Sequence, residues 1–88
     1  MQFSLEIVNE KGLHARASAK FVETVERFEA RALVSRDGME VSGDSIMGLM
    51  MLGAARGTSI DIQVEGAEAE PLAAALRALV ADRFGESA

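Results

Sequence analysis

The single histidine of the chain, His14, lies in the stretch Asn9 to Ser18, where an alternating apolar segment gives way to a helical pattern. Neutral imidazole is a nucleophile near pH 7, because the ordinary histidine pKa of about 6.5 leaves one ring nitrogen unprotonated. At the start of a helix, free backbone N–H groups and the positive end of the helix dipole attract anions. Arg16 could neutralise a phosphoryl group carried on this ring, and Gly12 permits a tight turn just before it. These residues place His14 where a phosphate group would be favoured.

A plainer interpretation of His14 stays open, since a lone histidine at a helix start commonly caps the helix or points into solvent. Two competing chemical signals fail. Gly48 and Gly53 have the glycine spacing of a nucleotide-binding loop, but Ala54-Ala55 replaces the lysine and hydroxyl residue that hold phosphates and Mg²⁺. The acidic residues give no catalytic pair, because those of the first helix recur at helical spacing as a solvated face: Glu23, Glu26 and Glu29.

The composition limits the class of protein. Eighty-eight residues make one small domain, residues 1–88, and without cysteine and with one histidine we expect no disulfide framework, metal cluster or cofactor. Nine Lys and Arg against fourteen Asp and Glu give a net charge of −5, which disfavours nucleic acid as a partner. The first residues lack the pattern of a signal peptide, and no later segment approaches a membrane span. We therefore expect a soluble, cytoplasmic protein that does not bind membranes.

Hydrophobic periodicity predicts the elements that position His14. Alternation predicts strands over 3–8, 30–36, 39–42 and 58–65, with Asp37-Gly38 as a hairpin turn between the second and third. The first helix has Ala17, Phe21, Val25 and Phe28 on its apolar side and Lys20, Glu23, Thr24 and Arg27 on the opposite side. Ser45 is expected to cap a short helix over 46–52 that Gly53 closes. A last helix begins near Pro71, continues to Phe84 and stops at Gly85, which leaves a frayed polar tail.

The short helix carries more apolar side chains than it can bury. Its residues 46–52 are Ile-Met-Gly-Leu-Met-Met-Leu, and one helix cannot bury all of them against a single sheet. Some of these side chains must face solvent. The methionines are either core filler or an adaptable binding surface, since methionine is flexible and polarisable.

Two separated motifs resemble those of the HPr family, the histidine-containing phosphocarriers of the bacterial phosphoenolpyruvate-dependent phosphotransferase system. Gly12-Leu13-His14-Ala15-Arg16 resembles the family's active-site signature, and the block from Ser45 to Gly57 resembles its regulatory-serine helix. Two positions depart from the family pattern. Ala17 stands where proline usually follows the arginine, and Asp44 stands where lysine often precedes the serine.

The resemblance implies both a fold and a set of roles. The order βαββαβα with one apolar face per strand predicts an α+β open-faced two-layer sandwich, and the resemblance implies a four-stranded antiparallel sheet with the first strand beside the fourth and three helices on one face. It implies that His14 accepts a phosphoryl group from Enzyme I, at Nδ1, and passes it to IIA-type domains, with Arg16 balancing the charge. Ser45 becomes a candidate for phosphorylation by an HPr kinase/phosphorylase. Outward residues of the short helix become a docking patch: Ile46, Met47 and Met50. Such a protein is a carrier without enzymatic turnover, and we expect a monomer.

Two alternatives stay open. One is a regulatory carrier of a nitrogen-type phosphotransferase branch rather than of sugar uptake, with the same histidine chemistry. The other is a small ligand-binding or RNA-binding α/β domain, because such sheets host many functions. An RNA-binding sheet needs exposed aromatic side chains and a basic face. This acidic chain has only four phenylalanines and no tryptophan or tyrosine.

Overall fold

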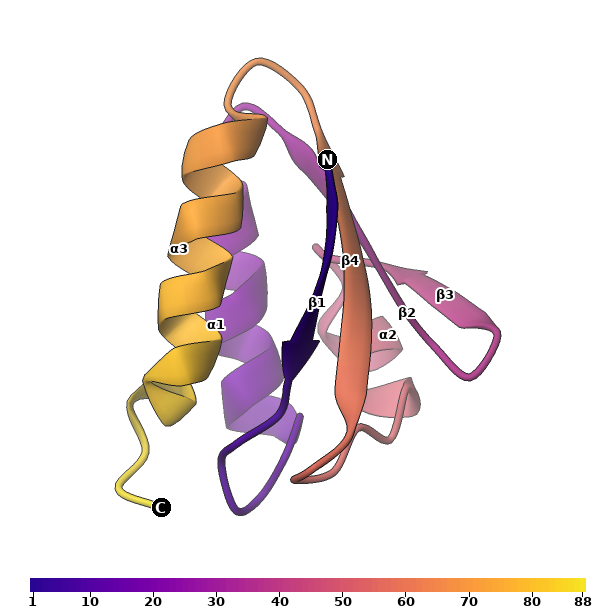
Figure 1. Ribbon diagram of the computed structural model, residues 1–88, viewed down its shortest axis with the longest axis vertical. Helices are drawn as coiled ribbons and strands as arrows, with labels where there is room; N and C mark the ends of the chain where they lie inside the picture. The colour runs from indigo at the N-terminus through magenta and orange to yellow at the C-terminus, as the bar shows by residue number, and fades with distance from the viewer.

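Alternating apolar and polar residues place four segments in one sheet, and two amphipathic helices lie against one face of it (Figure 1). The computed structural model describes residues 1–88. The elements in chain order are β1 (Gln2–Glu6), α1 (Ala15–Glu26), β2 (Arg31–Arg36), β3 (Met39–Ser42), α2 (Ile46–Met51), β4 (Ser59–Glu65) and α3 (Ala69–Ala81), followed by a short 3₁₀ turn (Arg83–Gly85). The predicted order βαββαβα is confirmed.

The sheet is antiparallel throughout, with the strand order β1-β4-β2-β3. The first strand lies beside the fourth, as the resemblance implied. β4 occupies an interior position, where Leu5 of β1 pairs with Ile60 and Val34 of β2 pairs with Ile62. Along β4 the buried residues alternate with exposed ones, which leaves the second face of the sheet open to solvent. Asp37 and Gly38 both have positive φ (51° and 82°), which fits the tight turn predicted between β2 and β3.

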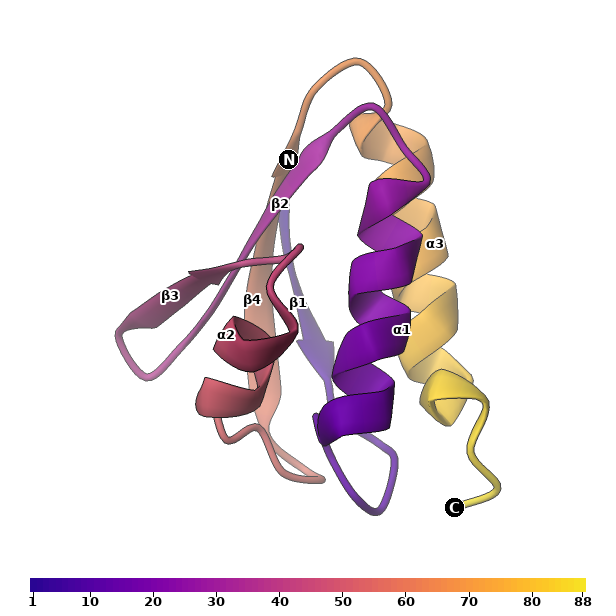
Figure 2. The same ribbon diagram turned by 180° about the vertical axis from the view of Figure 1, so that it is seen from behind.

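The helices bury one stripe each in a common core. α1 contributes Phe21 and α3 contributes Leu76, both fully buried, and the two helices run in opposite directions side by side (Figures 1 and 2). The six-residue α2 packs against α1 and β3 and buries Leu49 in the same core. None of the helices combines the length and the apolar character that a membrane span requires.

One residue of α1 was placed on the wrong side. The periodicity predicted that Thr24 faces solvent, but Thr24 is only 3% exposed in the structure. The buried side of α1 is wider than one stripe, because α2 and α3 contact this helix in addition to the core beneath it. The Thr24 hydroxyl tolerates burial because it donates to the Lys20 carbonyl at 2.9 Å.

The chain after α3 also differs from the prediction. The helix ends at Ala81 rather than at Phe84, and Arg83 and Phe84 then adopt left-handed conformations with φ of 54° and 55°. This reversal of direction buries Phe84 completely in the core. The prediction of a frayed tail is wrong for Glu86. The turn directs Glu86 toward the loop after β1, and there Glu86 contacts His14.

Candidate functional site

His14 lies at the end of a tight loop between β1 and α1, and Gly12 fixes the path of that loop. Gly12 has a φ of +66°, and a Cβ placed on it would lie 2.5 Å from the Ala54 carbonyl oxygen. The next residue, Leu13, donates its N–H to the same carbonyl at 3.0 Å, and the His14 N–H turns back to the Gly12 carbonyl at 2.9 Å. The predicted tight turn is confirmed, and only glycine fits where the loop crosses the segment after α2.

His14 occupies the N-cap position of α1 without capping the helix. Its backbone is extended (φ −75°, ψ −178°), and its side chain makes no capping hydrogen bond. The first intrahelical bond runs from the Ser18 N–H to the His14 carbonyl at 2.9 Å, while the N–H groups of residues 15–17 have no backbone acceptor. The side chain is 26% exposed. Neither plain interpretation, a helix cap or a fully solvated side chain, describes this histidine.

The imidazole ring has a carboxylate partner from the far end of the sequence. The His14 Nε2 contacts Glu86 Oε2, although the two residues are 72 positions apart. The second oxygen of Glu86 accepts a hydrogen bond from the buried Asn9 side-chain amide at 3.1 Å, and the same amide donates to the Gly12 carbonyl at 2.8 Å. Asn9 thus links the glycine turn to the carboxylate that faces the histidine.

Glu86 was missed by the sequence analysis. Residue type gave no signal, because a single glutamate after a predicted helix end reads as part of a polar tail. Burial of the carboxyl by itself raises the pKa, but the hydrogen bonds from His14 and Asn9 and the nearby charges of His14 and Lys11 outweigh it and lower the pKa of Glu86 below its ordinary value of 4.5. Glu86 is therefore an ionised carboxylate near pH 7.

The surroundings of His14 are more basic than the rest of the molecule. A hollow of about 490 Å³ beside the ring is lined by three cationic side chains, Lys11, Arg16 and Lys20, and by two carboxylates, Glu10 and Glu86. The chain as a whole carries a net charge of −5. Arg16 is exposed and forms no ion pair within the chain. The structure therefore brings the two residues predicted for the site, His14 and Arg16, to one hollow in which Arg16 remains available to an anion.

Ser45 and α2 form the second predicted region. Ser45 caps α2, since its hydroxyl accepts a hydrogen bond from the Gly48 N–H at 3.0 Å, as predicted. The apolar side chains that the helix cannot bury are exposed and define a patch, named here the α2 patch: Ile46, Met47, Met50 and Met51. Met47 is the most exposed of them, at 74%. Figure 2 shows α2 at the same end of the molecule as the start of α1, where His14 lies.

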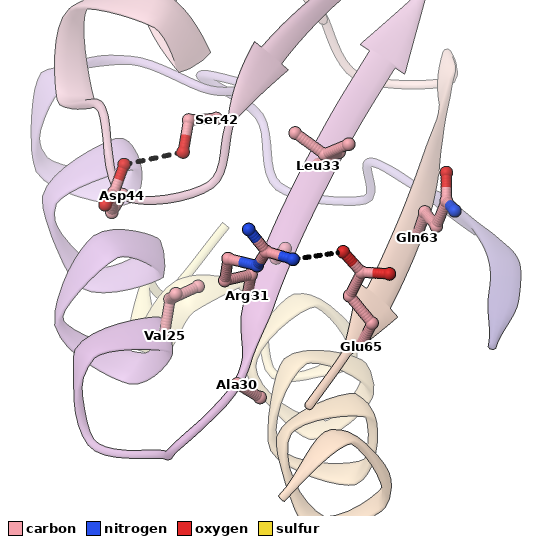
Figure 3. A pocket seen from close by; sticks show the side chains of 9 residues that line it. Val25, Ala30, Arg31, Leu33, Ser42, Asp44, Gln63 and Glu65 are labelled. Atoms are coloured by element: carbon pink, nitrogen blue, oxygen red, sulfur yellow. Dashed lines mark hydrogen bonds and ion pairs between the residues drawn. The ribbon is translucent and has the colours of Figure 1, made fainter. Parts of the chain in front are cut away.

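A different hollow, of about 280 Å³, lies at the side of β2 and between the end of α1 and the start of the loop before α2 (Figure 3). Its charged groups already have hydrogen-bond partners. Arg31 donates to Glu65 at 2.7 Å, and Asp44 accepts from the Ser42 hydroxyl at 2.6 Å. No histidine or other nucleophilic nitrogen lines this hollow, so the hollow beside His14 is the better candidate for chemistry.

Residues 1–82 match the protein family described as PTS HPr component phosphorylation site. Among known proteins, the chain is 47% identical over 83 residues to phosphocarrier protein HPr of Neisseria meningitidis, a match covering 94% of this chain and 93% of that one. It is also 36% identical over 84 residues to phosphocarrier protein NPr of Escherichia coli, covering 94% of this chain and 93% of that one.

Solved structures agree with the sequence matches. The crystal structure of HPr-C-His from Thermoanaerobacter tengcongensis aligns with a TM-score of 0.94 and 38% identity, and the alignment covers 100% of this chain and 99% of that one. A structure of an HPr dimer from the same organism aligns with a TM-score of 0.78 and 40% identity, covering 93% and 94% of the two chains. Fold, motifs and comparisons agree that the chain belongs to the HPr family of phosphocarriers of the phosphotransferase system.

Proposed function

We propose that His14 accepts a phosphoryl group from phosphorylated Enzyme I and passes it to IIA-type domains. The observation that carries the proposal is the placement of the only histidine at the N-terminus of α1, in a hollow that is locally basic. Its Nδ1 accepts no hydrogen bond from the first turn of the helix, so this nitrogen is available to attack phosphorus. The protein acts as a carrier and has no turnover of its own.

Arg16 and the start of α1 balance the charge of the carried group. A phosphoryl group adds about −1.5 to −2 charges near pH 7. The N–H groups of residues 15–17 have no backbone acceptor and lie at the positive end of the helix dipole. Arg16, which forms no internal ion pair, supplies a full positive charge beside them. Exposed groups of this kind hold the phosphoryl group without trapping it, because solvent screens the attraction.

The α2 patch is the docking surface in this proposal. Its residues expose flexible apolar side chains at the same end of the molecule as His14 (Figure 2), which suits a surface that must bind several partners in turn. Ser45 lies at the edge of the patch, so its phosphorylation by an HPr kinase/phosphorylase would place a charge against any docked partner. The carrier acts as a monomer in the cytoplasm, with one partner at a time on this patch.

The IIA domain that accepts the phosphoryl group decides whether this carrier serves sugar uptake or a nitrogen-type regulatory branch. A nitrogen-type regulatory carrier uses the same histidine, and the 36% identity to an NPr protein keeps this version in view. Capture of purified IIA domains of the sugar and nitrogen types by the phosphorylated protein distinguishes the two versions.

The test of the proposal is phosphorylation by phosphoenolpyruvate and Enzyme I. Wild type should gain one acid-labile, base-stable phosphoryl group by intact mass, and a folded His14→Ala variant should gain none. Arg16→Ala should fold normally and transfer poorly, because an exposed arginine is lost from the site rather than from the core. Undiminished labelling of His14→Ala would refute the carrier function, and an unchanged rate for Arg16→Ala would remove Arg16 from the mechanism.

A further inference from the structure

We infer that Glu86 is a positioning residue: its carboxylate binds the Nε2–H of His14, which orients the ring and leaves the lone pair on Nδ1 for the phosphoryl group. This inference rests on the proposed function of His14. The His14 Nε2 contacts Glu86 Oε2, and no other side chain forms a hydrogen bond with the imidazole. Glu86 thus acts on the reaction through the histidine rather than on the phosphoryl group.

The chemistry of the pair fixes the position of the proton. An ionised carboxylate only accepts hydrogen bonds, so the ring nitrogen that faces it must carry the proton. In a neutral imidazole with its proton on Nε2, the lone pair is on Nδ1. Nδ1 forms no hydrogen bond with the first turn of α1. The contact with Glu86 therefore selects the one neutral form of His14 whose free lone pair is at Nδ1.

One hydrogen bond holds the Glu86 carboxylate and another holds its backbone. Asn9, whose side chain is fully buried, donates to Glu86 Oε1 at 3.1 Å and leaves Oε2 for the histidine. The Glu86 N–H donates to the Arg83 carbonyl at 2.9 Å. The side chain of Glu86 is only 13% exposed. A glutamate so held differs from a mobile surface carboxylate that meets the histidine by chance.

The backbone that delivers Glu86 is strained. Arg83 and Phe84 are consecutive non-glycine residues with φ of 54° and 55°, a conformation that L-amino acids rarely adopt. Two contacts hold this turn in place: the fully buried Phe84 ring in the core and the Lys20 ammonium group on the Phe84 carbonyl at 2.7 Å. Consecutive strained residues persist when the surrounding structure enforces them, and they are concentrated at functional sites. Here the strained turn at Arg83 and Phe84 places the Glu86 carboxylate against the His14 ring.

During transfer the pair would act without moving its proton. The Nδ1 lone pair forms the bond to phosphorus, while the bond between phosphorus and the donor atom of Enzyme I breaks and the electron pair stays with that donor atom. The ring gains positive charge as the N–P bond forms, and the Nε2 proton remains between the ring and the carboxylate. Glu86 faces the developing charge on the ring side away from Nδ1, so it stabilises the ring without occupying the position of the phosphoryl group.

The first test measures the unphosphorylated protein by NMR and needs no partner. Histidine labelled with ¹⁵N shows directly which ring nitrogen carries the proton. Wild type should show one neutral form, protonated at Nε2, with a proton that exchanges slowly with water. Glu86→Ala should show a mixture of both forms and fast exchange, whereas Glu86→Gln, which keeps an acceptor oxygen, should retain the Nε2–H form. Glu10→Gln removes the other carboxylate of the hollow and is the matched control, with wild-type spectra expected.

The second test measures the rate at which Enzyme I phosphorylates each variant. Glu86→Ala should be slower by about tenfold, by analogy with the lower end of the loss seen when the partner that orients a metal-binding histidine is removed. Glu10→Gln should be unchanged. Unaltered spectra for Glu86→Ala, or altered spectra with an unaltered or faster rate, overturn the positioning role. A wild type that accepts no phosphoryl group overturns the proposed function of His14 instead, and the NMR result then stands alone.

Discussion

Gly12→Ala offers the sharpest test of how the fold positions His14. Gly12 has a φ of +66°, and its new Cβ would lie 2.5 Å from the Ala54 carbonyl oxygen and 3.0 Å from the Ala55 Cα. The left-handed conformation costs a residue with a Cβ about 1–2 kcal/mol. The contacts are with backbone atoms, so the loop itself must shift, which costs about 1–3 kcal/mol more. We expect the free energy of unfolding to fall by about 2–5 kcal/mol in total.

Gly53→Ala is the matched control for the conformational part. Gly53 has nearly the same φ, +61°, but a Cβ there meets no atom within 4 Å. Its expected cost is about 1–2 kcal/mol, from the left-handed conformation alone. The difference between the two variants therefore measures the close approach of the His14 loop to the segment after α2.

Urea and thermal unfolding at pH 7 measure both variants. Each kcal/mol should lower the melting temperature by about 4–8 °C in a domain of this size. We also expect Gly12→Ala, and not Gly53→Ala, to slow phosphorylation of His14, because a displaced loop moves the ring away from Glu86 and Arg16. Equal losses of stability for the two variants would refute the claim that the Ala54 carbonyl excludes a side chain at position 12.

Four further predictions concern the α2 patch, Ser45, Asp44 and Glu86. Met47→Glu should weaken association with Enzyme I by about 1–3 kcal/mol while unfolding changes by less than about 0.5 kcal/mol, because the side chain is 74% exposed. Ser45→Asp should slow phosphorylation of His14, because it places a negative charge beside the α2 patch. Asp44→Lys should improve phosphorylation of Ser45 by an HPr kinase, because this substitution removes a negative charge next to Ser45. Because the pKa of Glu86 is lowered, its contact with His14 stabilises the fold above pH 4.5, and this stabilisation is lost as the pH falls through the folded-state pKa. A ¹³C NMR titration of the Glu86 carboxyl should show a midpoint below 4.5.

The predictions for Met47, Ser45 and Glu86 each have a result that contradicts them. Met39→Glu, at an exposed methionine of β3 outside the α2 patch, is the control for Met47 and should bind Enzyme I normally. A large loss of melting temperature for Met47→Glu would place Met47 in the core. Equal Enzyme I rates for wild type, Ser45→Ala and Ser45→Asp would leave Ser45 as a helix cap only. A Glu86 midpoint at or above 4.5 would mean that burial outweighs its hydrogen bonds.

Short-range features of this protein were predictable because they depend on neighbouring residues. The alternation over 58–65 predicted β4, the dipeptide Asp37-Gly38 predicted its hairpin, and Ser45 predicted the cap of α2. The predicted excess of apolar side chains on α2 also follows from counting, since one short helix cannot bury all of its apolar side chains against a single sheet, and the structure fully buries only Leu49. The proposed phosphoryl acceptor was identifiable from residue type, because the chain has one histidine.

Contacts between distant segments were decided only by the tertiary structure. Thr24 looked solvent-facing by period, but the packing of α2 and α3 around α1 buried it. The pattern predicted that Phe84 belongs to the last turn of a helix. In the structure its ring is buried in the core after a left-handed turn at Arg83 and Phe84, a conformation that side-chain propensities do not favour. That turn brings Glu86 across 72 residues to His14. The sequence by itself determined which side chain we propose as the phosphoryl acceptor, whereas the carboxylate beside that side chain is set by long-range packing, which local pattern does not encode.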